Sequence, residues 1–146
     1  MSSIVLRFTA EPRTVNANGK VQGGTVMSWI DEAAQTCANR WANRDCATVA
    51  TGAMRFLRPI LIGDLVEVEA RLVFTGTTSM NIAVQVRSGN VIRGEMHIVT
   101  DCLTVFVAVD EEGRPLPVAA WSPETPGDMA LAERVRAHLQ ASRMVA

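Results

Sequence analysis

One segment near the N-terminus has the spacing of a long helix with a single buried face. It contains no internal glycine or proline, so we predict a helix over about residues 25–43. Apolar side chains recur there at intervals of three and four residues, the period of an α-helix with one apolar stripe. These side chains are Val26, Ile30, Ala33, Ala34, Cys37 and Trp41. Such a stripe needs an apolar surface to cover it.

The segments around this helix supply strands for that surface. Residues 65–73 and 80–87 alternate apolar and polar side chains, and a glycine-containing turn joins them, which predicts an antiparallel hairpin. Further strands are predicted at about 4–8, 47–56 and 97–109. One long helix against an antiparallel sheet of about five strands is a two-layer α+β fold in which the sheet wraps the helix.

Length and composition fit one domain and a tail. The chain has 146 residues, of which 48% are apolar and 20% charged, the size of a domain that buries its own core. We assign residues 1–126 to this domain and 127–146 to a C-terminal segment. Within that segment Leu131, Val135 and Leu139 lie four residues apart, which predicts a short amphipathic helix.

Charge, cysteines and hydropathy exclude several classes of protein. The formal charge of −1 is not that of a general nucleic-acid binder. The spacing of Cys37, Cys46 and Cys102 suggests neither a disulfide framework nor a metal site. The sequence has no apolar window long enough for a membrane span, and its N-terminus does not have the pattern of a signal peptide. We therefore expect a cytoplasmic protein that binds neither nucleic acid nor a membrane.

Two features near the start of the predicted helix bear on chemistry. Gly23 and Gly24 allow a ligand close to the first backbone N–H groups of a helix, which suit an oxyanion or a polarised carbonyl, but the same pair also suits a tight turn. Asp31 lies seven residues after Gly24, on the same side of the helix two turns later. One interpretation is that Asp31 and Glu32 are two acids that both face solvent. The other is that one of them faces away from water and belongs to a functional site. The pattern alone leaves these interpretations open.

Several short motifs in order resemble one known family. The sequence has no G-x-S-x-G or Walker motif, and neither His97 nor His138 has a nucleophile nearby in sequence. Instead, over about residues 11–126, the chain resembles the hotdog-fold acyl-CoA thioesterases of the YciA and cytosolic acyl-CoA hydrolase type. The motifs that carry the resemblance are residues 16–19, 23–34, 54–60, 62–64, 76–80 and 106–110.

The resemblance implies a hotdog fold and the hydrolysis of acyl-CoA to a free acid and CoA, a reaction of fatty acid metabolism, with no metal or other cofactor. The family's catalytic carboxylate falls on Asp31 and its partner asparagine on Asn16. Its glycine pair falls on Gly23 and Gly24, whose amides would polarise the thioester carbonyl. Asp31 acts either as a general base toward water or as a nucleophile that forms an anhydride, and the sequence does not choose between the two.

Side chains for the rest of the substrate are suggested by residue type. Coenzyme A carries phosphates, which favour arginine and hydroxyl donors, and the candidates are Arg58 in the F-x-R-P motif and Thr78 and Ser79 in the hairpin turn. For an acyl channel the candidates are apolar residues whose spacing fits core packing equally well. They are Met27, Trp29, Met54 and Phe56.

A single chain places the two halves of this site apart. Gly24 and Asp31 are separated by about 10 Å along a helix axis, too far to act on one carbonyl. Two antiparallel helices across a twofold axis would solve this, so we predict a homodimer unit, assembled further into a hexamer or a tetramer. The alternative function is a non-catalytic acyl-CoA-binding regulatory or sensor domain, which would keep the glycine pair without needing Asp31.

Overall fold

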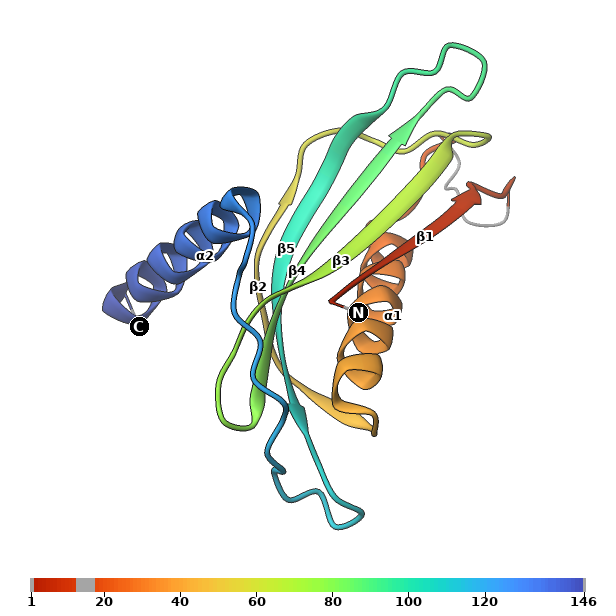
Figure 1. Ribbon diagram of the computed structural model, residues 1–146. Helices are drawn as coiled ribbons and strands as arrows, with labels where there is room; N and C mark the ends of the chain where they lie inside the picture. The colour runs from red at the N-terminus through yellow and green to blue at the C-terminus, as the bar shows by residue number, and fades with distance from the viewer. Residues whose placement is uncertain (1, 13–17, 146) are drawn as a thin grey trace.

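The computed structural model describes residues 2–12 and 18–145 of the chain. Five strands and two helices follow one another in these residues (Figure 1). They are β1 (Ser3–Thr9), α1 (Gly23–Ala42), β2 (Cys46–Phe56), β3 (Leu65–Thr75), β4 (Ser79–Gly89), β5 (His97–Ala108) and α2 (Pro126–Val145). The predicted order of strand, helix and four strands is confirmed. The C-terminal helix has 20 residues and is longer than the short one predicted.

The strands form one antiparallel sheet in the order β1-β3-β4-β5-β2. Consecutive strands β3, β4 and β5 are neighbours, as the hairpin pattern predicted, whereas β1 and β2 lie at opposite edges. The chain passes between these edges through α1, which lies along one face of the curved sheet (Figure 1). This is the predicted α+β arrangement, in which the sheet wraps the helix.

The core lies between α1 and the sheet. The strands present every second side chain to the helix, and Val68, Ile82 and Phe106 are fully buried there. The half-buried Trp41 packs against this core, and its Nε1 also donates a hydrogen bond to the carbonyl of Ala119 at 2.9 Å. The predicted stripe is confirmed. The buried residues of α1 are Val26, Ile30, Ala33, Ala34, Cys37 and Ala38.

The ends of α1 differ slightly from the prediction. The helix begins at Gly23, two residues earlier than predicted. Glycine is a poor helix former, but Gly23 and Gly24 both lie within the first turn of this helix. Gln22 precedes them with extended backbone and makes no side-chain capping bond. The helix ends at Ala42, where Asn43 has a φ of 56°, a left-handed conformation common after helices.

Helix α2 packs on the face of the sheet opposite α1 (Figure 1). Its buried residues Ala132 and Val135 contact Val73 of β3. Val73 faces α2 because side chains alternate along β3 and the preceding residue, Leu72, points into the core beside α1. The sheet therefore carries a helix on each face, a third partial layer beyond the two predicted.

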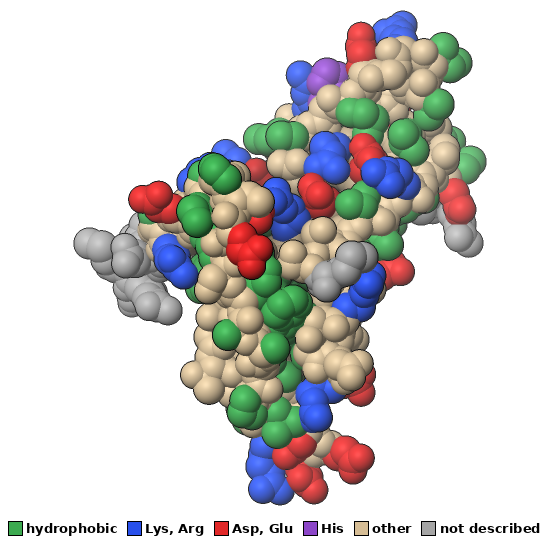
Figure 2. All heavy atoms as spheres, in the orientation of Figure 1, with side chains coloured by type: hydrophobic (Ala, Val, Ile, Leu, Met, Phe, Trp, Pro, Cys, Tyr) green, Lys and Arg blue, Asp and Glu red, His purple; other side chains and the backbone are tan. Residues whose placement is uncertain are grey.

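Ion pairs cover much of the sheet beside α2. Lys or Arg and Asp or Glu side chains are interspersed over this face (Figure 2). Opposite charges on neighbouring strands neutralise one another, which is the expected pairing for a solvated sheet face. The pairs across strands are Arg7–Glu67 at 2.6 Å, Arg87–Glu69 at 3.2 Å and Arg55–Asp101 at 2.8 Å, and Arg71 pairs with Asp128 of α2.

Candidate active site

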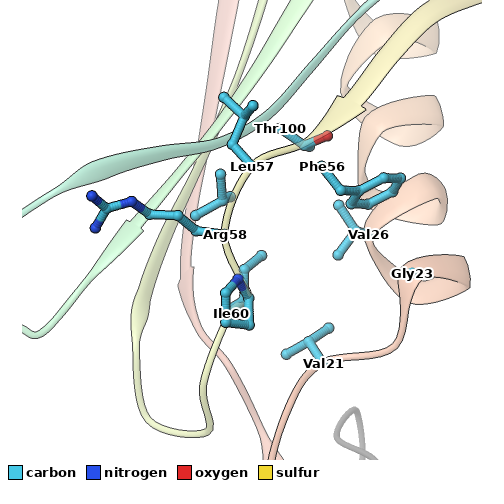
Figure 3. Close-up of a pocket in the computed structure, with 10 residues that line it drawn as sticks. Val21, Gly23, Val26, Phe56, Leu57, Arg58, Ile60 and Thr100 are labelled. Atoms are coloured by element: carbon cyan, nitrogen blue, oxygen red, sulfur yellow. The ribbon is translucent and has the colours of Figure 1, made fainter.

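A pocket of about 300 Å³ opens at the start of α1, and we call it the helix-start pocket. The ring of Phe56 lies over Val26, while Val21 and Ile60 lie on the other side of the opening (Figure 3). Its walls are mainly apolar, which suits an acyl or pantetheine chain. It is lined by Val21, Gly23, Val26, Phe56, Leu57, Arg58, Pro59, Ile60, Val99 and Thr100.

Backbone pairing holds the start of α1 beside the β2–β3 loop. The N–H of Val21 donates to the carbonyl of Ile60 at 2.8 Å, next to a bridge between Lys20 and Leu61. The carboxylate of Asp64 accepts a hydrogen bond from the N–H of Leu61 at 3.0 Å, which fixes the loop. These contacts bring Gly23 and Arg58, two of the predicted site residues, to one pocket.

The first amides of α1 are free to bind a ligand. The N–H groups of Thr25 and Val26 both donate to the carbonyl of Gln22, at 3.0 and 3.2 Å. The N–H groups of Gly23 and Gly24 find no acceptor in the parts of the chain that the structure describes. A Cβ added to Gly24 would meet no atom within 4 Å, so the backbone here is open to a substrate. A helix start of this kind stabilises a carbonyl that gains negative charge.

Asp31 lies on the outer face of α1, away from the sheet. Its side chain is exposed, like those of Met27 and Ser28 on the same face, and it does not line the helix-start pocket. Glu32 is exposed as well, so in the single chain both of these acids face solvent. One chain alone brings Gly23 to a pocket but does not bring Asp31 to it.

The other predicted site residues do not join the pocket within one chain. Asn16 lies outside the described residues. Thr78 and Ser79 lie at the turn between β3 and β4, where the carbonyl of Thr78 accepts a hydrogen bond from the N–H of Ala108 at 3.3 Å. This turn is at the far end of β3 from the β2–β3 loop, about 35 Å away at the rise of a strand.

Of the apolar candidates for an acyl channel, Phe56 alone lines the helix-start pocket. Trp29 packs edge-on against Phe8, with ring centroids 4.7 Å apart, and Met54 packs against the core. Met27 is half exposed on the outer face of α1. Core packing therefore accounts for Trp29, and Met27 shares the outer face with Asp31.

Strand β2 is an open edge that the sequence motifs did not single out. Residues 47–52 are all exposed, and β2 pairs only with β5 within the described chain. Thr48 pairs with the buried Phe106 and so faces the same side of the sheet as α1. The signal in the sequence is a run without charge, Ala-Thr-Val-Ala-Thr-Gly, since free edges are usually protected by charged residues.

Metal-binding and membrane-spanning features are absent from the part of the chain that the structure describes. No group of three or more His, Cys, Asp or Glu side chains there is arranged to hold a metal ion. Neither of its two helices has an apolar stretch sufficient to cross a membrane.

Comparison with known proteins identifies the family. The model of the thioesterase superfamily matches residues 18–94. The acyl-CoA thioester hydrolase YciA of Salmonella typhimurium is 39% identical over 118 residues, which cover 79% of this chain and 89% of that protein.

Solved structures show the same fold. An apo hexameric acyl-CoA thioesterase is 32% identical with a TM-score of 0.92, covering 97% of this chain and 91% of that one. An acyl-CoA hydrolase from Staphylococcus aureus, in complex with butyryl-CoA, CoA and CoA disulfide, is 28% identical with a TM-score of 0.87, covering 98% and 88%. Variants of that enzyme with an aspartate, a threonine or an asparagine changed to alanine are also solved. This chain, with its hotdog fold, therefore belongs to the thioesterase superfamily.

Proposed function

We propose that this protein hydrolyses acyl-CoA thioesters to a free acid and CoA. The observation that carries the proposal is the start of α1, where the amides of Gly23 and Gly24 have no acceptor among the described residues and Gly23 lines an apolar pocket. A thioester carbonyl seated there accepts hydrogen bonds from fixed donors, which stabilise the oxyanion as it forms. The likeness to a relative named as an acyl-CoA thioester hydrolase supports the same reaction.

Asp31 is the proposed catalytic carboxylate, and Asn16 and Thr48 are its proposed partners. In the S. aureus enzyme the asparagine, aspartate and threonine that were replaced are separated by 15 and 17 residues. Asn16, Asp31 and Thr48 have the same two separations in this chain. This agreement supports the first two assignments and adds Thr48, whose position on the α1 side of the open β2 edge is accessible to substrate.

The site is completed by a second copy of the chain. If the outer faces of two α1 helices pack antiparallel, Asp31 of one chain lies beside Gly23 and Gly24 of the other, and two equivalent sites arise. The exposed outer face of α1 and the uncharged edge of β2 both support this arrangement. Antiparallel pairing of two β2 edges also brings Thr78 and Ser79 of one chain toward the helix-start pocket of the other. The hexameric relatives support assembly of three such dimers.

In the proposed reaction, a thioester carbonyl is polarised by the glycine amides and attacked at carbon. Asp31 either takes a proton from the attacking water or attacks directly, forming an anhydride that water then opens. In both routes the C–S bond breaks, CoA leaves as a thiolate, and the acid is released. Single-turnover hydrolysis in ¹⁸O-labelled water tests for an anhydride that water opens at the Asp31 carbonyl carbon. In that route the label enters the Asp31 carboxylate and the released acid carries an unlabelled oxygen from Asp31, whereas in the general-base route the label enters the acid alone.

A thiol-release assay tests the function. We expect turnover of at least one member of a series of acetyl-, butyryl-, hexanoyl- and palmitoyl-CoA, and the series also gives the preferred chain length. Binding of acyl-CoA without turnover would contradict the hydrolase and favour a sensor domain.

The assembly is tested separately by a charge on the β2 edge. Val49 is 61% exposed there, and Val49→Lys places a cation where the partner strand would pair. We expect the variant to sediment as a smaller species and to lose activity. Met129→Lys, at a similarly exposed apolar residue on α2, is the control. A wild-type protein that is monomeric and active would contradict the two-chain site.

We place the protein in the cytoplasm. All three cysteines are free and buried, which fits a reducing compartment. Cell fractionation with an antibody against the chain tests this, and recovery from outside the cytoplasm would contradict it.

A further inference from the structure

A second pocket adjoins the helix-start pocket, and we call it the hairpin pocket because it lies beside the turn between β4 and β5. Its volume is about 490 Å³. Arg58, Pro59 and Val99 line both pockets, so the two pockets are neighbours. A long molecule seated at the start of α1 can reach the hairpin pocket by passing over these shared residues.

The two pockets differ in chemistry. The helix-start pocket is walled mainly by apolar side chains, whereas the hairpin pocket adds Arg93, His97 and Asn90. Arg58 stands at the border, and its guanidinium points away from Gly23 and Val26 (Figure 3). A histidine and Lys or Arg side chains gather at this end of the molecule (Figure 2). An apolar section followed by a cationic one matches a substrate with an acyl thioester at one end and phosphates at the other.

Arg58 and Arg93 have charges that the described residues do not neutralise. Neither forms an ion pair with a described carboxylate, in contrast to the paired arginines on the sheet face beside α2. Two acids line the hairpin pocket as well. Asp64 is engaged by the N–H of Leu61, while Glu95 is exposed and would repel a phosphate. An anion in this pocket is therefore drawn by the two arginines and opposed mainly by Glu95.

Hydrogen bonds to Asn90 stabilise the turn that carries Arg93. The Oδ1 of Asn90 accepts hydrogen bonds from the N–H groups of Ile92 and Arg93, at 2.9 and 3.2 Å, and the carbonyl of Asn90 accepts one from Gly94 at 3.0 Å. At its base a Cβ on Gly89 would lie 1.4 Å from the carbonyl oxygen of Glu95, so the two ends of the turn meet closely there. A fixed turn loses little entropy when Arg93 binds a ligand.

We propose that Arg58 and Arg93, together with the imidazole of His97, bind the phosphate groups of the CoA portion of the substrate in the hairpin pocket. The inference rests on the proposed function, since it assigns residues to the nucleotide end of the same substrate. Thr100 of the helix-start pocket and His97 are three residues apart on β5, about 10 Å, a distance that a pantetheine arm bridges. Arginine suits this role because its guanidinium binds phosphate through two parallel hydrogen bonds.

The test compares two substrates with the same acyl group. Butyryl-CoA carries the phosphates, and S-butyryl-N-acetylcysteamine carries none. We expect Arg93→Ala to raise KM for butyryl-CoA about tenfold, the size of one charge-assisted contact, with kcat and the phosphate-free substrate unaffected. Arg58→Ala should raise KM for butyryl-CoA more than KM for the phosphate-free substrate, and Glu95→Gln should lower KM for butyryl-CoA because it removes a like charge. The matched control is Arg134→Ala, an exposed arginine on α2.

Each outcome decides the proposal. Equal losses on both substrates, or no change on either, would overturn it. If the wild-type protein hydrolyses neither substrate, the proposed function fails, and calorimetric titration with CoA itself then tests the pocket independently of turnover. Weaker CoA binding by Arg93→Ala than by Arg134→Ala supports the assignment, whereas equal binding, or no binding by the wild type, overturns it.

Discussion

The two faces of α1 differ in what covers them. The inner face, which includes Val26, Ile30 and Cys37, is buried against all five strands. The outer face, with Gly24 and Asp31, is exposed in the single chain and carries mostly polar and small residues, together with Met27. The same twenty-residue helix thus stabilises the fold with one face and offers chemistry with the other. A residue of the outer face can therefore be changed without disturbing the core. Its effect on activity can then be measured separately from its effect on stability.

The largest expected effect is on the outer face. We expect Asp31→Asn to lower kcat about a thousandfold, the scale of losing a positioned base or nucleophile, while KM changes little. Because the side chain is exposed, the free energy of unfolding should stay within about 0.5 kcal/mol of the wild type. Steady-state thiol release and denaturant unfolding measure the two quantities.

Glu32→Gln is the matched control for that change. Glu32 is the neighbouring exposed acid on the same helix, and it is not proposed to touch substrate. Its removal should leave kcat within about twofold. Near-normal turnover by Asp31→Asn, or equal losses in the two variants, would remove Asp31 from the mechanism.

The next effect is on the inner face and appears in stability. Ile30 is 2% exposed, and Ile30→Ala should lower the free energy of unfolding by about 2–5 kcal/mol, through lost burial and the cavity that it leaves. Met27→Ala, half exposed on the outer face, should cost less than about 1 kcal/mol. Urea unfolding at low protein concentration compares them. Equal losses would mean that another chain covers the outer face as fully as the sheet covers the inner one.

Much of the fold could be predicted because periodicity records which side chains are buried. The three- and four-residue spacing from Val26 to Cys37 marked the inner face of α1, and the alternation in β3 and β4 marked their shared hairpin. The start of α1 was missed by two residues, since glycine scores as a poor helix former wherever it stands. The docking of α2 was not predicted, because the alternation in β3 places Val73 on the outer face of the sheet but does not show what covers it.

The site could be predicted in part, for a different reason. Gly23 and Arg58 are far apart in sequence, and only the family motifs put them in one site; the structure places them in one pocket. The residues that surround Asp31 could not be predicted from one chain, because Asp31 lies on the outer face of α1, and in our proposal a second chain covers that face. Arg93 lies in a hairpin turn that contains no known motif. It lies near Arg58 because β5, which follows that turn, is the neighbour of β2 in the sheet.

A smaller effect on stability follows from a thiol on the inner face. Burial raises the pKa of Cys37 from 9.0 to about 11, so the folded chain keeps this proton where the unfolded chain loses it. The unfolded state binds fewer protons above pH 9, and the free energy of unfolding therefore falls as the pH rises from 9 to 11, by at most about 2–3 kcal/mol. Below pH 9 both states keep the proton and this contribution is constant.

The substitution Cys37→Ala tests whether this thiol causes the fall in stability between pH 9 and 11. The variant should be less stable at pH 7, because it loses buried volume, yet its stability should fall less steeply between pH 9 and 11. Urea unfolding at a series of pH values gives both slopes. Cys102, whose pKa is raised to about 12, contributes in the same direction and remains in the variant. Parallel slopes for the wild type and the variant would show that Cys37 does not titrate differently in the two states.

The smallest expected effect returns to the outer face, at a residue whose change should separate activity from stability most clearly. A Cβ at Gly24 meets no atom within 4 Å and its φ is not positive, so Gly24→Ala should leave the fold intact and, as the better helix former, raise stability by up to about 1 kcal/mol. The added methyl group stands where the thioester must approach the amide, and we expect kcat/KM to fall about tenfold, the loss of one good contact. Gly127→Ala, at the second residue of α2, is the matched control and should raise stability without a change in kinetics. If Gly24→Ala is stabilised and fully active, the start of α1 binds no substrate, and the outer face loses half of its proposed site.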